Sequence, residues 1–237
     1  MRLCVPEAVP VAEAERLAWE IDDVCRELEE GGGPVVCVAL YGGEGFLFEP
    51  VDRSTWAPAT AAAAAIGRSL GRLSPPTLAV LAGNAVGPAW EVALACDLRI
   101  AVADARLGSP ALALGLLPGA GATQRLPRLA GLGTALRLLL LDEVLSGSEA
   151  VRLGLLHRAV PAAGLDDAVE TLLDELRAAA PLALAFAKEA VRQAFDLPLA
   201  AGLRLEADLS TLLQTTDDRA EGLRAFAERR SARFEGR

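Results

Sequence analysis

The sequence is poor in the residues that build metal centres and nucleic-acid surfaces. It contains one histidine and four cysteines among 237 residues, and no CxxC pair occurs. No cluster of His, Cys, Asp and Glu has the spacing of metal ligands, so no metal site is predicted. Aromatic residues make up only 4% of the chain and the formal net charge is −9. Both features argue against a nucleic-acid partner.

Long uniform apolar runs and a secretion-signal pattern are also missing. The best apolar run, residues 132–141, contains Arg137 and is followed by two acidic residues. A buried amphipathic helix is therefore expected there in place of a membrane span. The first residues lack the charged, apolar and small-residue zones of a signal peptide. We expect a cytoplasmic protein without a membrane partner, whose reduced and mostly buried cysteines are Cys4, Cys25, Cys37 and Cys96.

What the chain does have is apolar content and a regular alternation of patterns. Hydrophobic residues make up 52% of the sequence, which is enough for a sizeable core. Short apolar runs alternate with segments of helical periodicity, and the end of the chain is helical throughout. This order predicts an α/β core with parallel strands, residues 1–180, followed by a C-terminal helical region, residues 181–237. Strands are expected at 34–41, 78–81 and 98–102, and helices at 12–30, 59–73, from 89, from about 123, and at 129–141, 164–179 and 181–195.

The segment from Leu78 to Leu126 carries the strongest local signals. A short apolar run gives way to a glycine-rich turn and then to a helical pattern. Gly87 followed by Pro88 predicts a helix start, because proline suits the first helical position. Glu91 then falls in the first turn of this helix, and a Gly/Pro-rich segment, residues 118–121, precedes a further helix.

This segment resembles the crotonase superfamily, the enoyl-CoA hydratases and isomerases. The family pattern NGxAxGGGxELALACDxRIA is matched without a gap at most of its positions by residues 82–101. The pattern DARFGxPExxLGxxPGAGGTQRL is matched in the same way by residues 104–126. Similarity continues to Phe234 through a terminus like DDRxEGxxAFxEKRxxxF.

The resemblance implies a fold, a ligand and an assembly. The fold is a spiral of β-β-α units with a C-terminal helical region that forms a trimer contact. Only about ten residues precede the first helix, so the N-terminal strands are expected to be shortened. The ligand is a CoA thioester as substrate, with no other cofactor. The implied partners are further copies of the chain, in a homotrimer or hexamer, or an active relative.

Departures from the family pattern affect the positions implied to be catalytic. The middle glycine of the family's three-glycine run, which donates a backbone N–H to the thioester oxyanion, is Pro88, and proline has no N–H. The other oxyanion donor falls on Pro50, although this proline equally fits a role in fixing a surface loop. The N–H of Ala89 is a substitute donor. The second family glutamate is Ala111, so Glu91 is the only retained acid/base.

Simpler explanations exist for several of these residues. A glutamate in a first helical turn is favoured by the helix dipole alone, and Trp90 is as well suited to packing as to a pocket wall. His157, Asp97 and Arg99 are expected to be structural. The basic residues near the C-terminus fit a solvated surface better than a site for CoA phosphates; they are Arg229, Arg230 and Arg233. The residues that match family pocket positions, and are predicted to bind substrate, are Trp90, Ala111, Leu116 and Gly119.

Two classes of function follow from this pattern. The first is a divergent enzyme that acts on an acyl-CoA or carrier-bound acyl thioester with Glu91 alone, such as a proton-shifting isomerase or a narrowed hydratase-like activity, without standard hydration. The second is a non-catalytic acyl-thioester-binding or assembly subunit of the same fold. Glu91 and the PGAG segment favour the first class, whereas Pro88, Pro50 and Ala111 favour the second.

Overall fold

The computed structural model describes residues 1–5, 9–30, 37–42, 47 and 52–237. In this part of the chain, five parallel strands form the main sheet in the order β1-β2-β3-β5-β8. A small second sheet has the order β4-β6-β7. The strands of the main sheet are β1 (Arg2–Val5), β2 (Val38–Gly42), β3 (Thr77–Leu81), β5 (Leu98–Val102) and β8 (Arg158–Val160). Those of the small sheet are β4 (Ala85–Val86), β6 (Arg106–Gly108) and β7 (Leu145–Ser146).

The two sheets are linked by repeated β-β-α units. Strand β3 continues into β4 and then helix α3, and β5 continues into β6 and then helix α4. The α-helices before the C-terminal region are α1 (Ala14–Glu30), α2 (Trp56–Arg72), α3 (Pro88–Ala95), α4 (Ala122–Ala130), α5 (Leu132–Leu140), α6 (Gly147–Arg152) and α7 (Leu165–Arg177). Short 3₁₀ helices are η1 (Val11–Glu13), η2 (Leu112–Leu114) and η3 (Ala162–Gly164).

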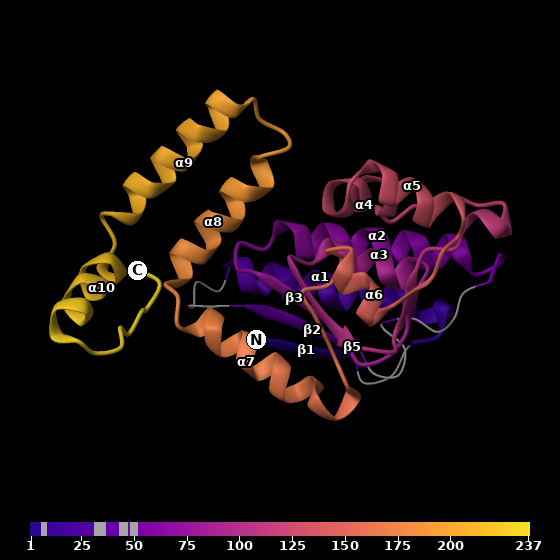
Figure 1. Ribbon diagram of the computed structural model, residues 1–237, viewed down its shortest axis with the longest axis horizontal. Helices are drawn as coiled ribbons and strands as arrows, with labels where there is room; N and C mark the ends of the chain where they lie inside the picture. Colours follow the sequence, from indigo (N-terminus) through magenta and orange to yellow (C-terminus); the bar gives the residue numbers. More distant parts are fainter. Residues whose placement is uncertain (6–8, 31–36, 43–46, 48–51) are drawn as a thin grey trace.

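Helices α1, α2 and α3 pack side by side over the main sheet (Figure 1). Their apolar faces and the strands form one continuous core, because strands buried on both faces need apolar residues at successive positions. All five residues of β3 are buried. The core therefore holds the carboxyl ends of the strands, and the loops that follow them, in fixed positions.

The C-terminal helices extend away from the sheets (Figure 1). They are α8 (Pro181–Gln193), α9 (Leu199–Leu213) and α10 (Asp217–Glu228). Helix α8 is attached to the core through Asp97, whose carboxylate oxygens lie 2.8 Å from Lys188 Nζ and 2.7 Å from Arg192 Nη2. Lys188 also donates to the Pro75 carbonyl at 2.8 Å. Burial opposes ionisation of Asp97, but the two cations outweigh it and lower its pKa.

Most of the elements predicted from the sequence are confirmed, including β5 at its predicted bounds and the start of α3 at Pro88. The helix predicted at 129–141 is wrong as a single element: Gly131 has φ +79° and separates α4 from α5. Helix α2 begins three residues earlier than predicted, after a turn in which Asp52 accepts hydrogen bonds from the Ser54 and Thr55 N–H groups at 2.8 and 2.9 Å. One four-residue strand, β1, precedes α1 in the described part of the chain.

Candidate active site

Helix α3 places Glu91 at the junction of the two sheets. Its N-cap, Gly87, has φ +72°, a conformation that glycine adopts at little cost. The Gly87 N–H donates to the Gly108 carbonyl of β6 at 2.8 Å, which fixes the helix start against the small sheet. Pro88 follows at the first helical position, so Glu91 lies in the first turn.

The carboxylate of Glu91 is fully buried and asymmetrically bound. Its Oε2 accepts hydrogen bonds from the Ala120 and Ala122 N–H groups at 2.8 and 2.9 Å. Its Oε1 has no hydrogen-bond partner among the described residues. One oxygen is therefore held in place, while the other is buried without a hydrogen bond from the described chain.

Burial raises the pKa of Glu91, because removal of water disfavours the charged carboxylate. The two backbone N–H groups, the Ser109 hydroxyl and the Arg125 guanidinium act in the opposite direction without cancelling the effect of burial. The buried Ser109 hydroxyl donates its single proton to the Gly87 carbonyl at 3.3 Å. A carboxyl group with a raised pKa is suited to accept and return protons closer to neutral pH.

Arg125 and Gly121 shape the loop that binds Glu91. Gly121 has φ +119°, and a Cβ at this position would lie 1.9 Å from Arg125 Nη1. The same Nη1 donates to the Ala120 carbonyl at 2.7 Å. The guanidinium thus occupies the space beside Gly121 and holds the loop so that two N–H groups converge on Glu91.

Of the two predicted oxyanion positions, the structure describes Pro88. Pro88 is buried at the first position of α3 and offers no N–H. The next N–H groups, of Ala89 and Trp90, have no acceptor within the helix by geometry, and Gly87 has no side chain to cap them. Pro50 lies outside the described residues.

Three of the residues predicted to bind substrate lie in the segment that precedes the loop that binds Glu91. Ala111 is fully buried, and its carbonyl accepts from the Leu116 N–H at 3.0 Å. Leu116 is half-buried, and Gly119 is exposed next to Ala120. Trp90 instead packs within the main hydrophobic core. Its environment therefore agrees with the packing explanation.

The residues expected to be structural have structural partners. His157 Nδ1 accepts from the backbone N–H of Arg99 at 3.1 Å, and the backbone N–H of His157 donates to the Arg99 carbonyl at 3.0 Å. The buried Arg99 side chain donates to the Leu155 and Cys96 carbonyls at 2.6 and 2.5 Å. These hydrogen bonds join β5 to the segment that precedes β8. In the described part of the chain, no group of three or more His, Cys, Asp or Glu is arranged to hold a metal ion.

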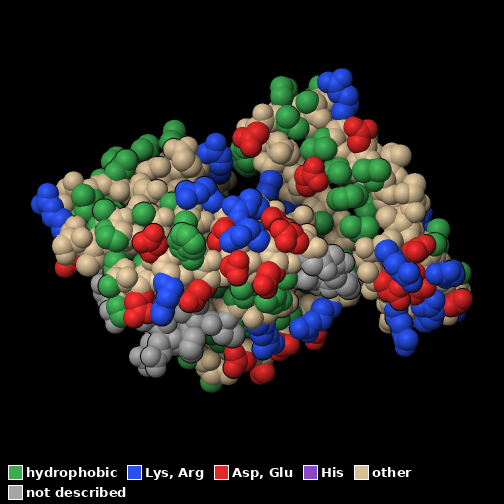
Figure 2. All heavy atoms as spheres, turned by 180° about the vertical axis from the view of Figure 1, so that it is seen from behind, with side chains coloured by type: hydrophobic (Ala, Val, Ile, Leu, Met, Phe, Trp, Pro, Cys, Tyr) green, Lys and Arg blue, Asp and Glu red, His purple; other side chains and the backbone are tan. Residues whose placement is uncertain are grey.

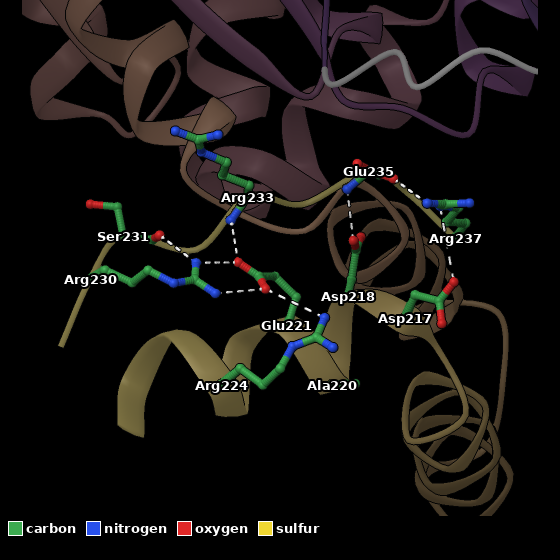
Figure 3. A pocket seen from close by; sticks show the side chains of 10 residues that line it. All are labelled: Asp217, Asp218, Ala220, Glu221, Arg224, Arg230, Ser231, Arg233, Glu235 and Arg237. Atoms are coloured by element: carbon green, nitrogen blue, oxygen red, sulfur yellow. Dashed lines mark hydrogen bonds and ion pairs between the residues drawn. The ribbon is translucent and has the colours of Figure 1, made fainter. Parts of the chain in front are cut away.

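The basic C-terminal end borders a cavity of about 720 Å³ between α10 and the last residues (Figure 3). Arg230 points to Glu221, with nitrogen–oxygen distances of 2.5 and 3.0 Å, and also pairs with Glu228. Asp218 accepts from the Glu235 and Gly236 N–H groups at 2.7 and 2.9 Å. Arg230 is therefore committed to pairs within the chain.

Some residues of the site were not singled out from the sequence. Ser109 and Arg125 lie inside the matched motif, but their contacts with Gly87 and Ala120 depend on the folded loops. Thr60 has its methyl group 2.6 Å from the position that a Cβ on Gly119 would occupy. It comes from α2 and belongs to no motif, so no local signal identified it.

The chain is similar in sequence and in fold to enoyl-CoA hydratases. An enzyme from Escherichia coli, 2,3-dehydroadipyl-CoA hydratase, is 40% identical over 162 residues, covering 68% of this chain and 64% of that protein. Crotonyl-CoA hydratase from Syntrophomonas wolfei is 36% identical over 174 residues, covering 72% and 67%. The crystal structure of enoyl-CoA hydratase from Bacillus anthracis matches with a TM-score of 0.85 and 31% identity, covering 94% of this chain and 89% of that one.

The parallel sheet, the β-β-α units and the helical C-terminus together define the crotonase fold. The family model for enoyl-CoA hydratase/isomerase matches residues 63–237, and the chain belongs to this family. The matched regions span a little under two thirds of the length of the Escherichia coli relative.

Proposed function

We propose that this protein acts on an acyl-CoA or carrier-bound acyl thioester, with Glu91 as its single acid/base and without standard hydration. The observation that carries this proposal is the Glu91 carboxylate: fully buried, held through Oε2 and unpartnered at Oε1 among the described residues. A raised pKa at such a group suits transfer of a proton to and from carbon. Family membership supports an acyl thioester as the ligand.

A single carboxylate can make both proton transfers of a double-bond shift, and the N–H of Ala89 is the donor left to the dienolate oxygen in place of Pro88. Glu91 takes a proton from Cα of a 3-enoyl thioester, and the C–H electron pair moves into a dienolate on the thioester oxygen. The resulting carboxylic acid returns the same proton to Cγ, which leaves a 2-enoyl thioester. No other reactant enters or leaves, so the step needs no second glutamate at position 111.

The test is to incubate the pure protein with 2-enoyl- and 3-enoyl-CoA substrates and follow the absorbance of the conjugated thioester. We expect 3-enoyl-CoA to be converted to the conjugated product, and Glu91→Gln to abolish the conversion. Rapid loss of the conjugated absorbance from 2-enoyl-CoA, through water addition, would contradict the proposal.

The second candidate is a non-catalytic acyl-thioester-binding or assembly subunit. It is favoured by Pro88 and Ala111, which remove one donor and one carboxylate relative to the family pattern. This candidate requires an acyl-CoA to bind with no conversion of either enoyl isomer. It also requires Glu91→Gln to leave the binding affinity nearly unchanged.

We further propose a homotrimer or hexamer, with residues 181–237 as the region between copies, and a cytoplasmic location. Exposed apolar side chains on α8, α9 and α10 support the assembly.

The buried cysteines support the proposed location. Cys25, Cys37 and Cys96 are free and buried, and burial raises their pKa values to about 11, 11 and 12, which disfavours the reactive thiolate. No helix in the described part of the chain has both the length and the apolar composition needed to cross a bilayer.

A further inference from the structure

We propose that the Trp56 indole N–H and the Thr60 hydroxyl form a hydrogen-bonding subsite on α2 for an oxygen atom of the bound acyl thioester. This inference rests on the proposed function and assigns a further group of residues to the same site. Neither residue belongs to the matched motif, and both are far from Glu91 in the sequence.

The first observation is that both polar atoms are buried without a partner. Trp56 is 5% exposed, and its Nε1 has no hydrogen-bond partner among the described residues. Thr60 Oγ1 is likewise inaccessible and unpartnered in the described structure. Buried polar groups are nearly always hydrogen-bonded, so two such atoms one helical turn apart indicate a binding group that is absent from the free chain.

The second observation places Thr60 beside the loop that binds Glu91. The Thr60 methyl lies 2.6 Å from the position that a Cβ on Gly119 would take, and Gly119 precedes Ala120, which donates to Glu91. Arg53 Nη2 lies 4.0 Å from the corresponding position on Gly115. Trp56 lies between Arg53 and Thr60 along the chain. The start of α2 therefore lies beside residues 115–119, which lead into the loop that binds Glu91.

The packing of α2 against α3 agrees with this placement. Gly67, in the middle of α2, has its Cβ position 3.4 Å from Ala95 at the end of α3. The two helices pack along each other. Thr60 lies two turns before Gly67 and contacts Gly119, which precedes the Ala120 N–H that binds Glu91.

The chemistry of the two groups indicates what they bind. An indole N–H can only donate, whereas a threonine hydroxyl can donate or accept. An oxygen acceptor is therefore the kind of group that both residues can bind. It is either the thioester carbonyl, which lacks a donor at Pro88, or an oxygen substituent on the acyl chain.

A ligand-binding role and a structural role of Thr60 predict different changes in unfolding temperature when the hydroxyl is removed. Because the Thr60 hydroxyl makes no bond in the free protein, Thr60→Val should leave the unfolding temperature unchanged or raise it, yet weaken ligand binding. Valine also keeps the methyl group against Gly119. Thr77 is the matched control: its buried hydroxyl donates to Asp97 at 2.9 Å and accepts from the Asp97 N–H at 3.0 Å. Thr77→Val should lower the unfolding temperature and leave ligand affinity unchanged.

The test measures the affinity of butyryl-CoA and 3-hydroxybutyryl-CoA by isothermal titration. We expect Thr60→Val to weaken binding about 5- to 10-fold, and Thr60→Ser to retain it. Weaker binding of both thioesters identifies the thioester carbonyl as the bound oxygen. Weaker binding of the hydroxyacyl thioester alone identifies the chain oxygen. Unchanged affinity for both would mean that water alone occupies the pair, and the subsite would be rejected.

A second measurement separates this inference from the proposed function. The ¹⁵N-labelled protein has three indole N–H resonances, and Trp56→Phe assigns that of Trp56. Titration with butyryl-CoA and 3-hydroxybutyryl-CoA should move this resonance while that of the exposed Trp19 stays in place. If backbone resonances of the Glu91 loop respond and the Trp56 indole does not, the subsite is wrong and the proposed function stands. If no resonance responds to either thioester, both are wrong.

Discussion

At the residue scale, the two oxygens of Glu91 have different surroundings, and this difference explains why the residue suits proton transfer. Oε2 is fixed by two N–H groups of the 119–122 loop. Oε1 has no partner among the described residues. The loop itself depends on Arg125 and on glycine at position 121. The geometry around the carboxylate is therefore produced by residues more than 25 positions away.

The raised pKa of Glu91 predicts a pH dependence of both rate and stability. Proton abstraction requires the carboxylate, so the rate should rise as pH increases through the raised pKa. The folded state binds the proton more tightly than the unfolded state, whose pKa is near 4.5. The contribution of Glu91 to stability should therefore fall as pH rises from about 4.5 through the raised value.

Thermal unfolding of the wild type and Glu91→Gln across this pH range checks the sign. The wild type should lose its advantage over the glutamine variant as pH increases, because only the wild type acquires a buried charge. A difference that grows with pH would show that the folded protein stabilises the carboxylate, contrary to the effect of burial.

A second residue-scale prediction concerns hydration. One group must take a proton from water and another must deliver one to Cα, and Ala111 can do neither. We expect the wild type to hydrate crotonyl-CoA very slowly, and Ala111→Glu alone not to rescue it, because Pro88 still lacks an N–H. A donor to the oxyanion is commonly worth about 3 kcal/mol. Ala111→Glu combined with Pro88→Gly should rescue more than the two single changes added together, since both groups act on one transition state.

Steady-state hydration rates of the four proteins in this cycle give the coupling directly. Efficient hydration by the unaltered protein, lost on Glu91→Gln, would show that one glutamate and a displaced donor are sufficient.

At the element scale, the attachment of α8 depends on one buried charge cluster. The Lys188 side chain is 8% exposed and contacts both Asp97 and the Pro75 carbonyl. Arg192 adds a second cation to Asp97 and donates to the Gly71 carbonyl at 2.6 Å. These contacts join the C-terminal helices to the end of α2 and to the loops before β3 and β5.

Lys188→Met should therefore detach α8 locally. Removing one partner of a buried ion pair commonly costs about 3–5 kcal/mol, and Arg192 retains part of the interaction. Hydrogen exchange should become faster in α8 than in β3. Arg158→Met is a suitable control, because Arg158 pairs with exposed Glu175 at 3.1 Å, and its effect should be much smaller. Equal exchange in the Lys188→Met variant and the wild type would exclude this anchoring role.

The same cluster predicts acid sensitivity at α8. The pKa of folded Asp97 lies below its usual value of 3.8, so its contribution to stability is complete above that value. The contribution is lost as pH falls from there through the folded pKa.

At the scale of the whole molecule, the C-terminal helices present an apolar surface that the single chain does not cover. The face opposite to that of Figure 1 shows hydrophobic side chains over the C-terminal helices and a charged cluster at their end (Figure 2). Phe226 is 86% exposed. The large exposed apolar residues in this region are Val191, Phe195, Leu199, Leu203, Leu212, Leu223 and Phe226. Such a surface is typical of a face buried on association.

We expect the protein to form a homotrimer or a dimer of trimers, and Leu199→Asp with Phe226→Asp to shift it toward the monomer. Light scattering after size exclusion at micromolar concentration measures the mass. Trp19→Asp is the control and should leave the mass unchanged. Trp19 is 71% exposed, comparably to Leu199, but it lies on α1, outside the C-terminal helices. A monomeric wild type would rule out this assembly.

Sequence patterns were enough to predict the fold and the place of Glu91 in the first turn of α3. Local patterns are sufficient for this, because the start of α3 depends on Gly87 and Pro88, and strands such as β5 on a short apolar run. The matched motif then defined the order of the β-β-α units.

The use of the side chains depends on the folded core. Packing buried Trp90 in the core and brought Arg125 over Gly121. It also left the polar atoms of Trp56 and Thr60 buried without partners in the described chain. Burial and hydrogen-bond partners depend on residues distant in sequence, since Thr60 and Gly119 meet only after the core forms. No local pattern encodes such a contact, whereas the start of a helix is set by its own few residues.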